Sequence, residues 1–159
     1  MKLLHKVIIS VFLKPELTQS DLDIEKRIID CMKMLSAVDI DHEKLQITAQ
    51  TVTGFNERKI KTFTLILEKE SHTNAFLSKL SSALNSEQKS LLLIQEESRL
   101  DENLDFFIRL GLNELLRNEY YITESGDCFH IKMVIAAFPK TRKSAIKVIE
   151  KIFGEQLQQ

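Results

Sequence analysis

The sequence predicts an α+β fold in which a largely antiparallel sheet carries helices on one of its faces. In several segments apolar residues recur at every second position, which is typical of strands with one buried face. In other segments they recur at spacings of three and four, as in amphipathic helices. The two patterns follow one another in the order β-α-β-β-α-α-β-(β)-β-α, which favours one antiparallel sheet over a parallel one.

Length and composition fit one soluble domain that spans residues 1–159. The chain is 43% hydrophobic and 28% charged, both ordinary values for a globular protein. No apolar run approaches the ~20 residues that a membrane span needs. The N-terminal run loosely mimics a secretory signal, but His5 and Lys6 interrupt it, so we interpret it as a strand and expect a cytoplasmic protein. The net charge of -1 excludes a strongly basic nucleic-acid binder, so such binding needs a local patch.

The first elements are a strand, a helix and a hairpin. Residues Leu3 to Leu13 alternate, with Leu3 on the buried side, and Pro15 ends the strand. Ser20 is the expected N-cap of a helix that runs to about residue 35. Alternation returns over residues 45–50 and 60–69, and the polar turn between these two segments predicts a β-hairpin.

The middle of the chain is predicted to be helical before it returns to the sheet. Two apolar stripes predict consecutive helices, the second capped by Ser86. A turn at 101–103 leads into a strand over 106–110 and a short helix over 112–117. Residues 120–124 are a candidate edge strand.

The stretch from Thr123 to Pro139 contains a turn at Gly126 and Asp127. The alternation that follows, from Phe129 to Ala137, predicts a long strand in the interior of the sheet. Pro139 cannot donate to a sheet ladder, so the strand is expected to end there. Thr141 is the expected N-cap of a final amphipathic helix.

The second face of this sheet has a mixed composition. Its expected members are Lys6, Ser10, Thr48, Thr62, Thr64, Phe107, Arg109, His130 and Lys132, with Ile8, Ile66, Val134 and Phe138. Aromatic and basic residues on an open sheet can stack nucleic-acid bases, and Phe107 with Arg109 and Lys132 would do so here. The aliphatic content favours a different outcome, in which a homodimer buries the face.

No residue pattern indicates catalysis, a metal or a cofactor. The chain has no GxSxG, Walker or GxGxxG motif, and its histidines lack HxxxH spacing. Asp101, Glu102 and Asp105 fit a solvated turn better than a metal site. Cys31 and Cys128 are expected to be buried, reduced thiols. We therefore expect no enzyme.

Two basic clusters are candidate phosphate contacts, and we expect them to lie on one side of the molecule. The first comprises Arg58, Lys59 and Lys61 at the start of the third strand; ordinary edge protection of a hairpin would also explain it. The second comprises Lys140, Arg142 and Lys143 at the start of the last helix. Cations there oppose the helix dipole, and with the free amides of the first turn they could cradle a phosphate. The alternative is that these cations bind nothing and that the protein tolerates their small unfavourable interaction with the helix dipole.

Several segments together resemble a known archaeal family. They are HKVIISVFLKPE, TVTGFNERKIKTFTLILEKESHTNAFLSKL, SRLDENLDFFIRL and GDCFHIKMVIAAFPKTRKSAIKVIEKIF, and they cover most of the chain. The family is that of the archaeal RNA-binding proteins described as predicted exosome subunits. The resemblance implies a fold similar to that of the ribosomal protein that binds 5S RNA, and a role in RNA processing or degradation. It brings Arg99, Asp101, Asp127 and His130 into the family pattern without a role for any of them.

These observations lead to a non-enzymatic RNA-binding module that contacts the phosphate backbone. The expected RNA-binding residues are Arg58, Lys59, Lys61, Arg109, Lys132, Lys140, Arg142 and Lys143. The partners would be RNA, a second copy of the chain and an RNA-processing complex, with no membrane. The alternative is a homodimeric adaptor that docks on such a complex without touching RNA.

Overall fold

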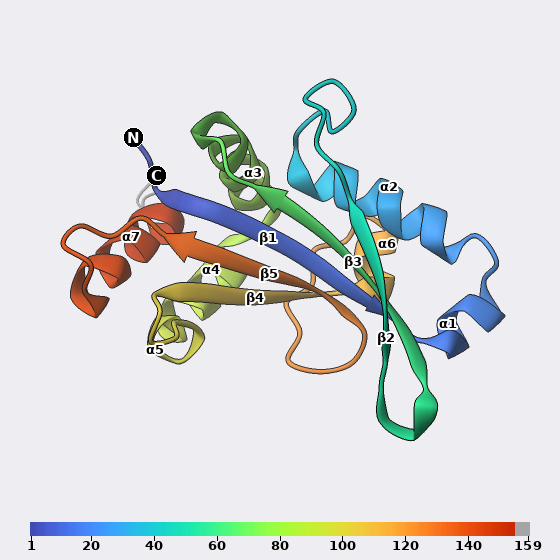
Figure 1. Ribbon diagram of the computed structural model, residues 1–159. Coiled ribbons are helices and arrows are strands. Elements are labelled where there is room, and N and C mark those ends of the chain that lie inside the picture. Colours follow the sequence, from blue (N-terminus) through green and yellow to red (C-terminus); the bar gives the residue numbers. More distant parts are fainter. Residues whose placement is uncertain (155–159) are drawn as a thin grey trace.

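Five strands form one antiparallel sheet in the computed structural model, which describes residues 1–154 apart from the side chains of residues 19 and 20 (Figure 1). The strands lie in the order β2-β3-β1-β5-β4. Their bounds are Leu4–Leu13 for β1, Thr48–Thr53 for β2, Lys59–Leu67 for β3, Asp105–Gly111 for β4 and Cys128–Ile135 for β5.

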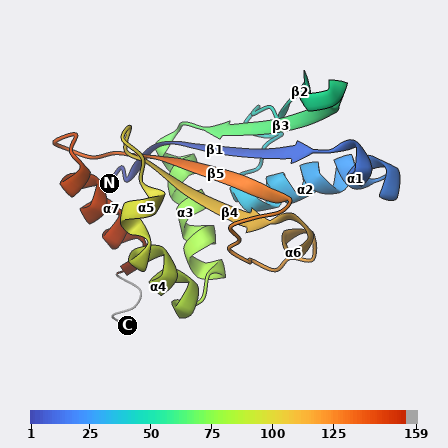
Figure 2. The same ribbon diagram turned by 90° about the horizontal axis from the view of Figure 1, so that it is seen from below.

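The helices cover one face of this sheet (Figure 2). They are α1 (Pro15–Ser20), α2 (Ile24–Ser36), α3 (Glu70–Ala83), α4 (Ser86–Ile94), α5 (Glu96–Arg99), α6 (Leu112–Leu116) and α7 (Arg142–Gly154), with a 3-10 turn, η1, at Phe55–Glu57. The predicted α+β class, with an antiparallel sheet and helices on one face, is confirmed. Within residues 1–154 no helix is both long enough and apolar enough to cross a membrane.

The core lies between the sheet and the helices, because each strand buries alternate side chains. The fully buried side chains from the strands include Val7, Ile9, Val11, Leu65, Leu67, Phe106, Ile108, Phe129, Ile131 and Met133. The helices contribute Ile28, Met32, Leu35, Phe76, Leu80, Ala145, Ile149 and Phe153. Cys31 and Cys128 are free and buried, as predicted. Burial of this apolar area is the main stabilising contribution.

The long C-terminal strand is interior, as predicted, but it is shorter. β5 lies between β1 and β4 and ends at Ile135 instead of Pro139. The N–H of Ala136 still donates to the carbonyl of Leu3 at 2.9 Å, after which the N–H of Ala137 turns back to Ile135. The chain thus leaves the sheet before the proline, because its partner strand β1 begins at Leu4.

A β-bulge near the start of β1 changes which residues face the core. Leu4 pairs with Ile135 and Lys6 with Val134, so β1 has one more residue than β5 over this step. One extra residue reverses the alternation of side chains. Leu4 is therefore fully buried, which the alternation did not predict. Leu3, predicted on the buried side, is partly buried and packs against the core.

Three further boundaries differ from the predictions. The helix expected to begin after Ser20 begins at Ile24, with Asp23 as its N-cap and α1 before it; the side chain of Ser20 lies outside the described residues. The second strand begins only at Thr48, and all its residues are exposed because it is an edge strand with no helix packed on it. Residues 120–124 form a single bridge, between Ile122 and Leu110, in place of a strand.

The cap of α4 is Asn85, not Ser86. The side chain of Asn85 accepts a hydrogen bond from the backbone N–H of Gln88 at 2.8 Å, and the Gln88 side chain accepts one from the N–H of Asn85 at 2.9 Å. This reciprocal pair is a capping box. Ser86 is the first helical residue.

Replacing Asn85 with Ala should therefore lower the free energy of unfolding by about 1 kcal/mol, the usual cost of losing an N-cap side chain. The matched control is Ser86→Ala at the next position, which should leave stability within about 0.5 kcal/mol of the wild type. Urea unfolding followed by circular dichroism measures both. Equal losses for the two variants would contradict the assignment of the cap.

Candidate nucleic-acid interface

The sheet face opposite the helices is open within the described residues, and the strand register arranges its side chains in rows. One row runs across four strands as Thr64, Ser10, His130 and Arg109. The next row contains Ile66, Ile8, Lys132 and Phe107. Arg109 and Lys132 were both predicted to lie on this face. The register places them in adjacent rows, Arg109 on β4 and Lys132 on β5.

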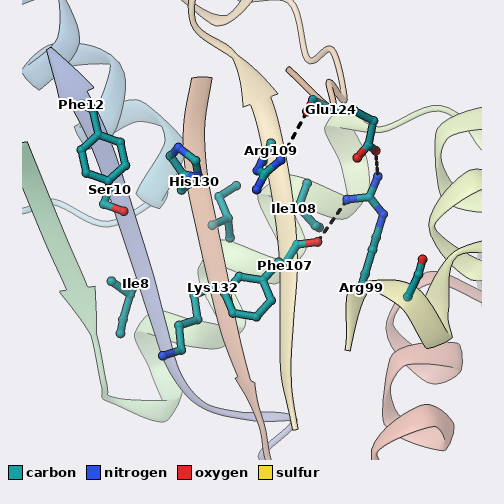
Figure 3. A pocket seen from close by; sticks show the side chains of 12 residues that line it. Ile8, Ser10, Phe12, Arg99, Phe107, Ile108, Arg109, Glu124, His130 and Lys132 are labelled. Atoms are coloured by element: carbon teal, nitrogen blue, oxygen red, sulfur yellow. Dashed lines mark hydrogen bonds and ion pairs between the residues drawn. The ribbon is translucent and has the colours of Figure 1, made fainter. Parts of the chain in front are cut away.

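A hollow of about 470 Å³ lies over β1, β5 and β4 on this face (Figure 3). The β1, β5 and β4 members of the two rows line it, and Phe12 closes one end. Arg99 and Glu124 form a wall beyond β4. The open face is therefore concave and polar at its centre, with exposed aromatic rings at its margins.

The wall is held by a network of charged hydrogen bonds. Arg99 Nη2 donates to Glu124 Oε1 at 2.6 Å, and its Nη1 donates to the carbonyl of Phe107 at 3.1 Å. Arg109 Nη1 donates to the carbonyl of Glu124 at 3.3 Å. Charge-assisted bonds of this kind are stronger than neutral ones and orient both partners. Arg99 thus has a structural task, whereas the exposed guanidinium of Arg109 makes only this one bond within residues 1–154.

His130 lies at the centre of the hollow and carries no charge at neutral pH. Its ring meets Phe12 edge-on, with centroids 5.2 Å apart and planes at 75°. Burial, and then the nearby Arg109, lower its pKa from the ordinary value of 6.5. Cys128 Sγ is 3.5 Å from Nε2, and burial raises the pKa of that thiol, so this neighbour is also neutral.

Lys132 shares its charge with a buried carboxylate. Its Nζ is 3.3 Å from Oδ2 of Asp105, which is buried, while Lys132 itself remains half exposed. Phe107, on the neighbouring strand, exposes 39% of its surface. The lysine therefore has a fixed position beside an accessible aromatic ring.

The cations of the hairpin are largely paired with acids. Arg58 forms an ion pair with Glu16 of α1. Lys61 is 2.5 Å from Glu25 of α2 and lies over the ring of Phe63. Lys59 is exposed and forms no ion pair among the described residues.

At the start of α7, the half-exposed guanidinium of Arg142 is bound to protein groups. Its guanidinium donates to the Glu97 carboxylate at 3.0 Å and to the carbonyls of Glu97, Leu100 and Asp101 at 2.7, 3.1 and 3.2 Å. These groups surround the C-terminal end of α5, where carbonyls lack helical partners. Lys140 and Lys143 are exposed. Thr141 caps α7 as predicted, since its Oγ1 accepts from the N–H of Ser144 at 3.2 Å.

The two basic clusters lie at opposite ends of the strands, as both views show (Figures 1 and 2). Lys61 pairs with Leu13 at the end of β1, whereas residues 140–143 follow the end of β5 near Leu4. The expectation of one positive side is therefore wrong. Arg109 and Lys132 lie between the clusters, on the open face.

Sequence reasoning did not assign a role to Arg99 or Phe12. Arg99 lies in the segment SRLDE, which contributed to the family resemblance, but its partner Glu124 is 25 residues away and joins it only through the loop after α6. Phe12 falls on the open side of β1 by alternation, and that parity was the available signal.

Arg142→Ala should lower the free energy of unfolding by about 1 to 2 kcal/mol, because a half-exposed guanidinium with several backbone acceptors is lost. The neighbouring Lys143→Ala should change stability by less than about 0.5 kcal/mol. Thermal or urea unfolding of the two variants makes the comparison. If both lose the same amount, the α5–α7 contact contributes nothing.

The lowered pKa of His130 predicts a pH-dependent stability. Because the unfolded chain takes up the proton more readily, the wild type should lose stability as the pH falls below about 6.5 and until the lower folded-state pKa is passed. His130→Gln removes this contribution, so the difference between variant and wild type should shift in the variant's favour over that interval. Urea unfolding at pH 7.5, 6.5 and 5.5 would test it; a constant difference would contradict it.

Comparisons with known proteins agree with the fold and add a family. AF2318 from Archaeoglobus fulgidus superposes with a TM-score of 0.79 at 19% identity, covering 94% of this chain and 99% of that one. Mth689 from Methanothermobacter thermautotrophicus, a DUF54 protein, gives 0.73 at 19% identity over 95% and 98% of the two chains.

A curated relative and a family profile complete these comparisons. RNA-binding protein PAB1135 from Pyrococcus abyssi is 19% identical over 124 residues, which are 78% of this chain and 80% of that protein. The profile of a family described as RNA binding matches residues 17–137. That match spans most of the chain, and the chain therefore belongs to the RNA-binding family.

Proposed function

We propose that this protein binds RNA and that the open sheet face is its principal contact surface. The observation that carries the proposal is the concave face itself, on which Arg109 and Lys132 stand in adjacent rows beside exposed rings. Membership of the RNA-binding family supports RNA as the ligand. Arginine and lysine would neutralise phosphates, which supply most of the affinity of such interfaces.

The other predicted cations contribute unequally in this proposal. Lys59, Lys140 and Lys143 are exposed and would extend the contact beyond either end of the sheet. Arg58, Lys61, Lys132 and Arg142 each share their charge with a carboxylate, so they would contribute less than Arg109. RNA would therefore run along the strands, from the hairpin end towards the start of α7.

We propose a binding role without catalysis, in the cytoplasm and alongside RNA-processing or RNA-degrading machinery such as the exosome. The family resemblance of the sequence supports this setting. The charges of the open face disfavour the alternative homodimer through that face, since two facing copies would bring Arg109 and Lys132 towards like charges.

The proposal predicts salt-sensitive binding to RNA. The wild type should bind a pool of short RNAs, and its affinity should fall steeply with added salt. Arg109→Ala should weaken binding and reduce the slope of log K against log salt by roughly 0.7, the share of one phosphate contact on a single strand. Fluorescence anisotropy over a salt series gives both quantities.

Lys26→Ala is the control, because Lys26 is exposed on α2, in the helical layer. It should retain the affinity and slope of the wild type. Absence of binding by the wild type would overturn the proposed function. An Arg109 variant with an unchanged slope would remove the sheet face from the interface.

A further inference from the structure

We infer that the hollow on the open sheet face takes unpaired nucleotides of single-stranded RNA, with one base stacked on Phe107 and another on Phe12. This inference rests on the proposed function and specifies its substrate class. The backbone between the two bases would pass Arg109.

The two rings have the exposure that stacking requires. Phe107 exposes 39% and Phe12 46% of their surface, although both belong to strands whose alternate residues are fully buried. Exposed aromatic rings on a rigid sheet cost free energy in water unless something covers them. Every base has an aromatic face, so stacking on such rings is tolerant of sequence.

The strand register places the two rings too far apart to stack on the same base. Phe107 and Ile8 both pair with Lys132, and Phe12 lies four residues beyond Ile8 on β1. With ~3.3 Å per residue along a strand and ~4.8 Å between strands, the two Cα atoms are roughly 16 Å apart. A single base cannot span that separation, and Arg109 lies in the row between those of the two rings.

The centre of the hollow matches a ribose-phosphate segment. The guanidinium of Arg109 supplies positive charge there, while the ammonium of Lys132 is paired with Asp105 at its margin. Ser10 and the uncharged imidazole of His130 lie in the same row as Arg109 and offer hydrogen bonds to sugar hydroxyls. The 2′-hydroxyl is the group by which a protein distinguishes RNA from DNA.

A duplex fits this arrangement poorly. In an RNA duplex the bases are stacked on one another and their faces are inaccessible to side chains. Arg99 and Glu124 also stand beside β4 at the edge of the hollow (Figure 3). A flexible single strand can turn its bases into the hollow, whereas a rigid duplex would contact only the rim.

The test compares one labelled RNA of about 12 nucleotides of mixed sequence, as a single strand and annealed to its complement, with the full-length protein. The wild type should bind the single strand at least ~5-fold more tightly than the duplex, since each stacked base contributes about that factor or more. Phe107→Leu and Phe12→Leu should each weaken single-strand binding by ~5-fold or more. Their salt slopes should match that of the wild type, because no charge is removed.

Ile94→Ala is the control, since Ile94 is 81% exposed at the end of α4, in the helical layer and outside the hollow. It should bind both RNAs as the wild type does. Thermal melts establish that the variants are folded, and all three sites are at the surface.

The outcomes separate the two proposals. If the wild type binds neither RNA, RNA binding itself is overturned. If it binds single strand and duplex equally, or if both hollow variants bind the single strand like the wild type, RNA binding stands and the stacking site is overturned.

Discussion

The pairing of β1 with β5 in the middle of the sheet is the constraint on which the rest of the structure depends. Its register places Ile9 against Ile131 and Val7 against Met133, all fully buried. The intervening residues, Ile8, Ser10, His130 and Lys132, are thereby committed to the opposite face. A slip of one residue would exchange the two sets and bury Lys132 and His130 in the core. The same hydrogen-bond ladder therefore determines both the stability of the fold and the composition of the hollow.

The charges of the molecule are used mainly to hold its elements together. Arg142 fastens α7 to the end of α5, Lys61 joins β3 to α2, and Arg99 supports the loop that carries Glu124. On the open face, Arg109 forms no ion pair among the described residues and so stays available to a ligand. Its position adds to its effect, because a concave face focuses the potential of its charges.

Most of the fold could be predicted from alternation alone, because the burial of one face is strong in β3, β4 and β5. The prediction failed where neither face of a strand is buried, and where a bulge shifts the buried positions by one residue. β2 is exposed on both sides, so the sequence TAQTVT marks its extent poorly, and the bulge in β1 reverses the alternation at Leu3. The N-caps of α2 and α4 were missed by three residues and by one, since neighbouring polar residues such as Asn85 and Ser86 are equally plausible caps.

The candidate site was less predictable, because it depends on contacts between distant segments. Arg109 and Lys132 could be assigned to the open face from their parity. The ion pairs that occupy the basic clusters join residues 42 positions apart for Arg58 and 45 for Arg142, and no local pattern reveals them. The hollow likewise needs the loop around Glu124, whose position depends on the bonds of Arg99 and Arg109.

The two outer strands of the sheet differ in what remains of their backbone hydrogen-bonding capacity. On β4, residues 121–123 bond to Arg109 and Gly111, Asp101 bonds to Asp105, and Arg99 occupies the carbonyl of Phe107. β2 pairs only with β3 among the described strands, and its six residues carry no charge. An additional strand from another polypeptide could therefore extend the sheet only beyond Thr48–Thr53, two strands away from β1. Pairing of another polypeptide with the free edge of β2 would leave the hollow accessible. The protein could then join a larger complex and bind RNA in the hollow at the same time.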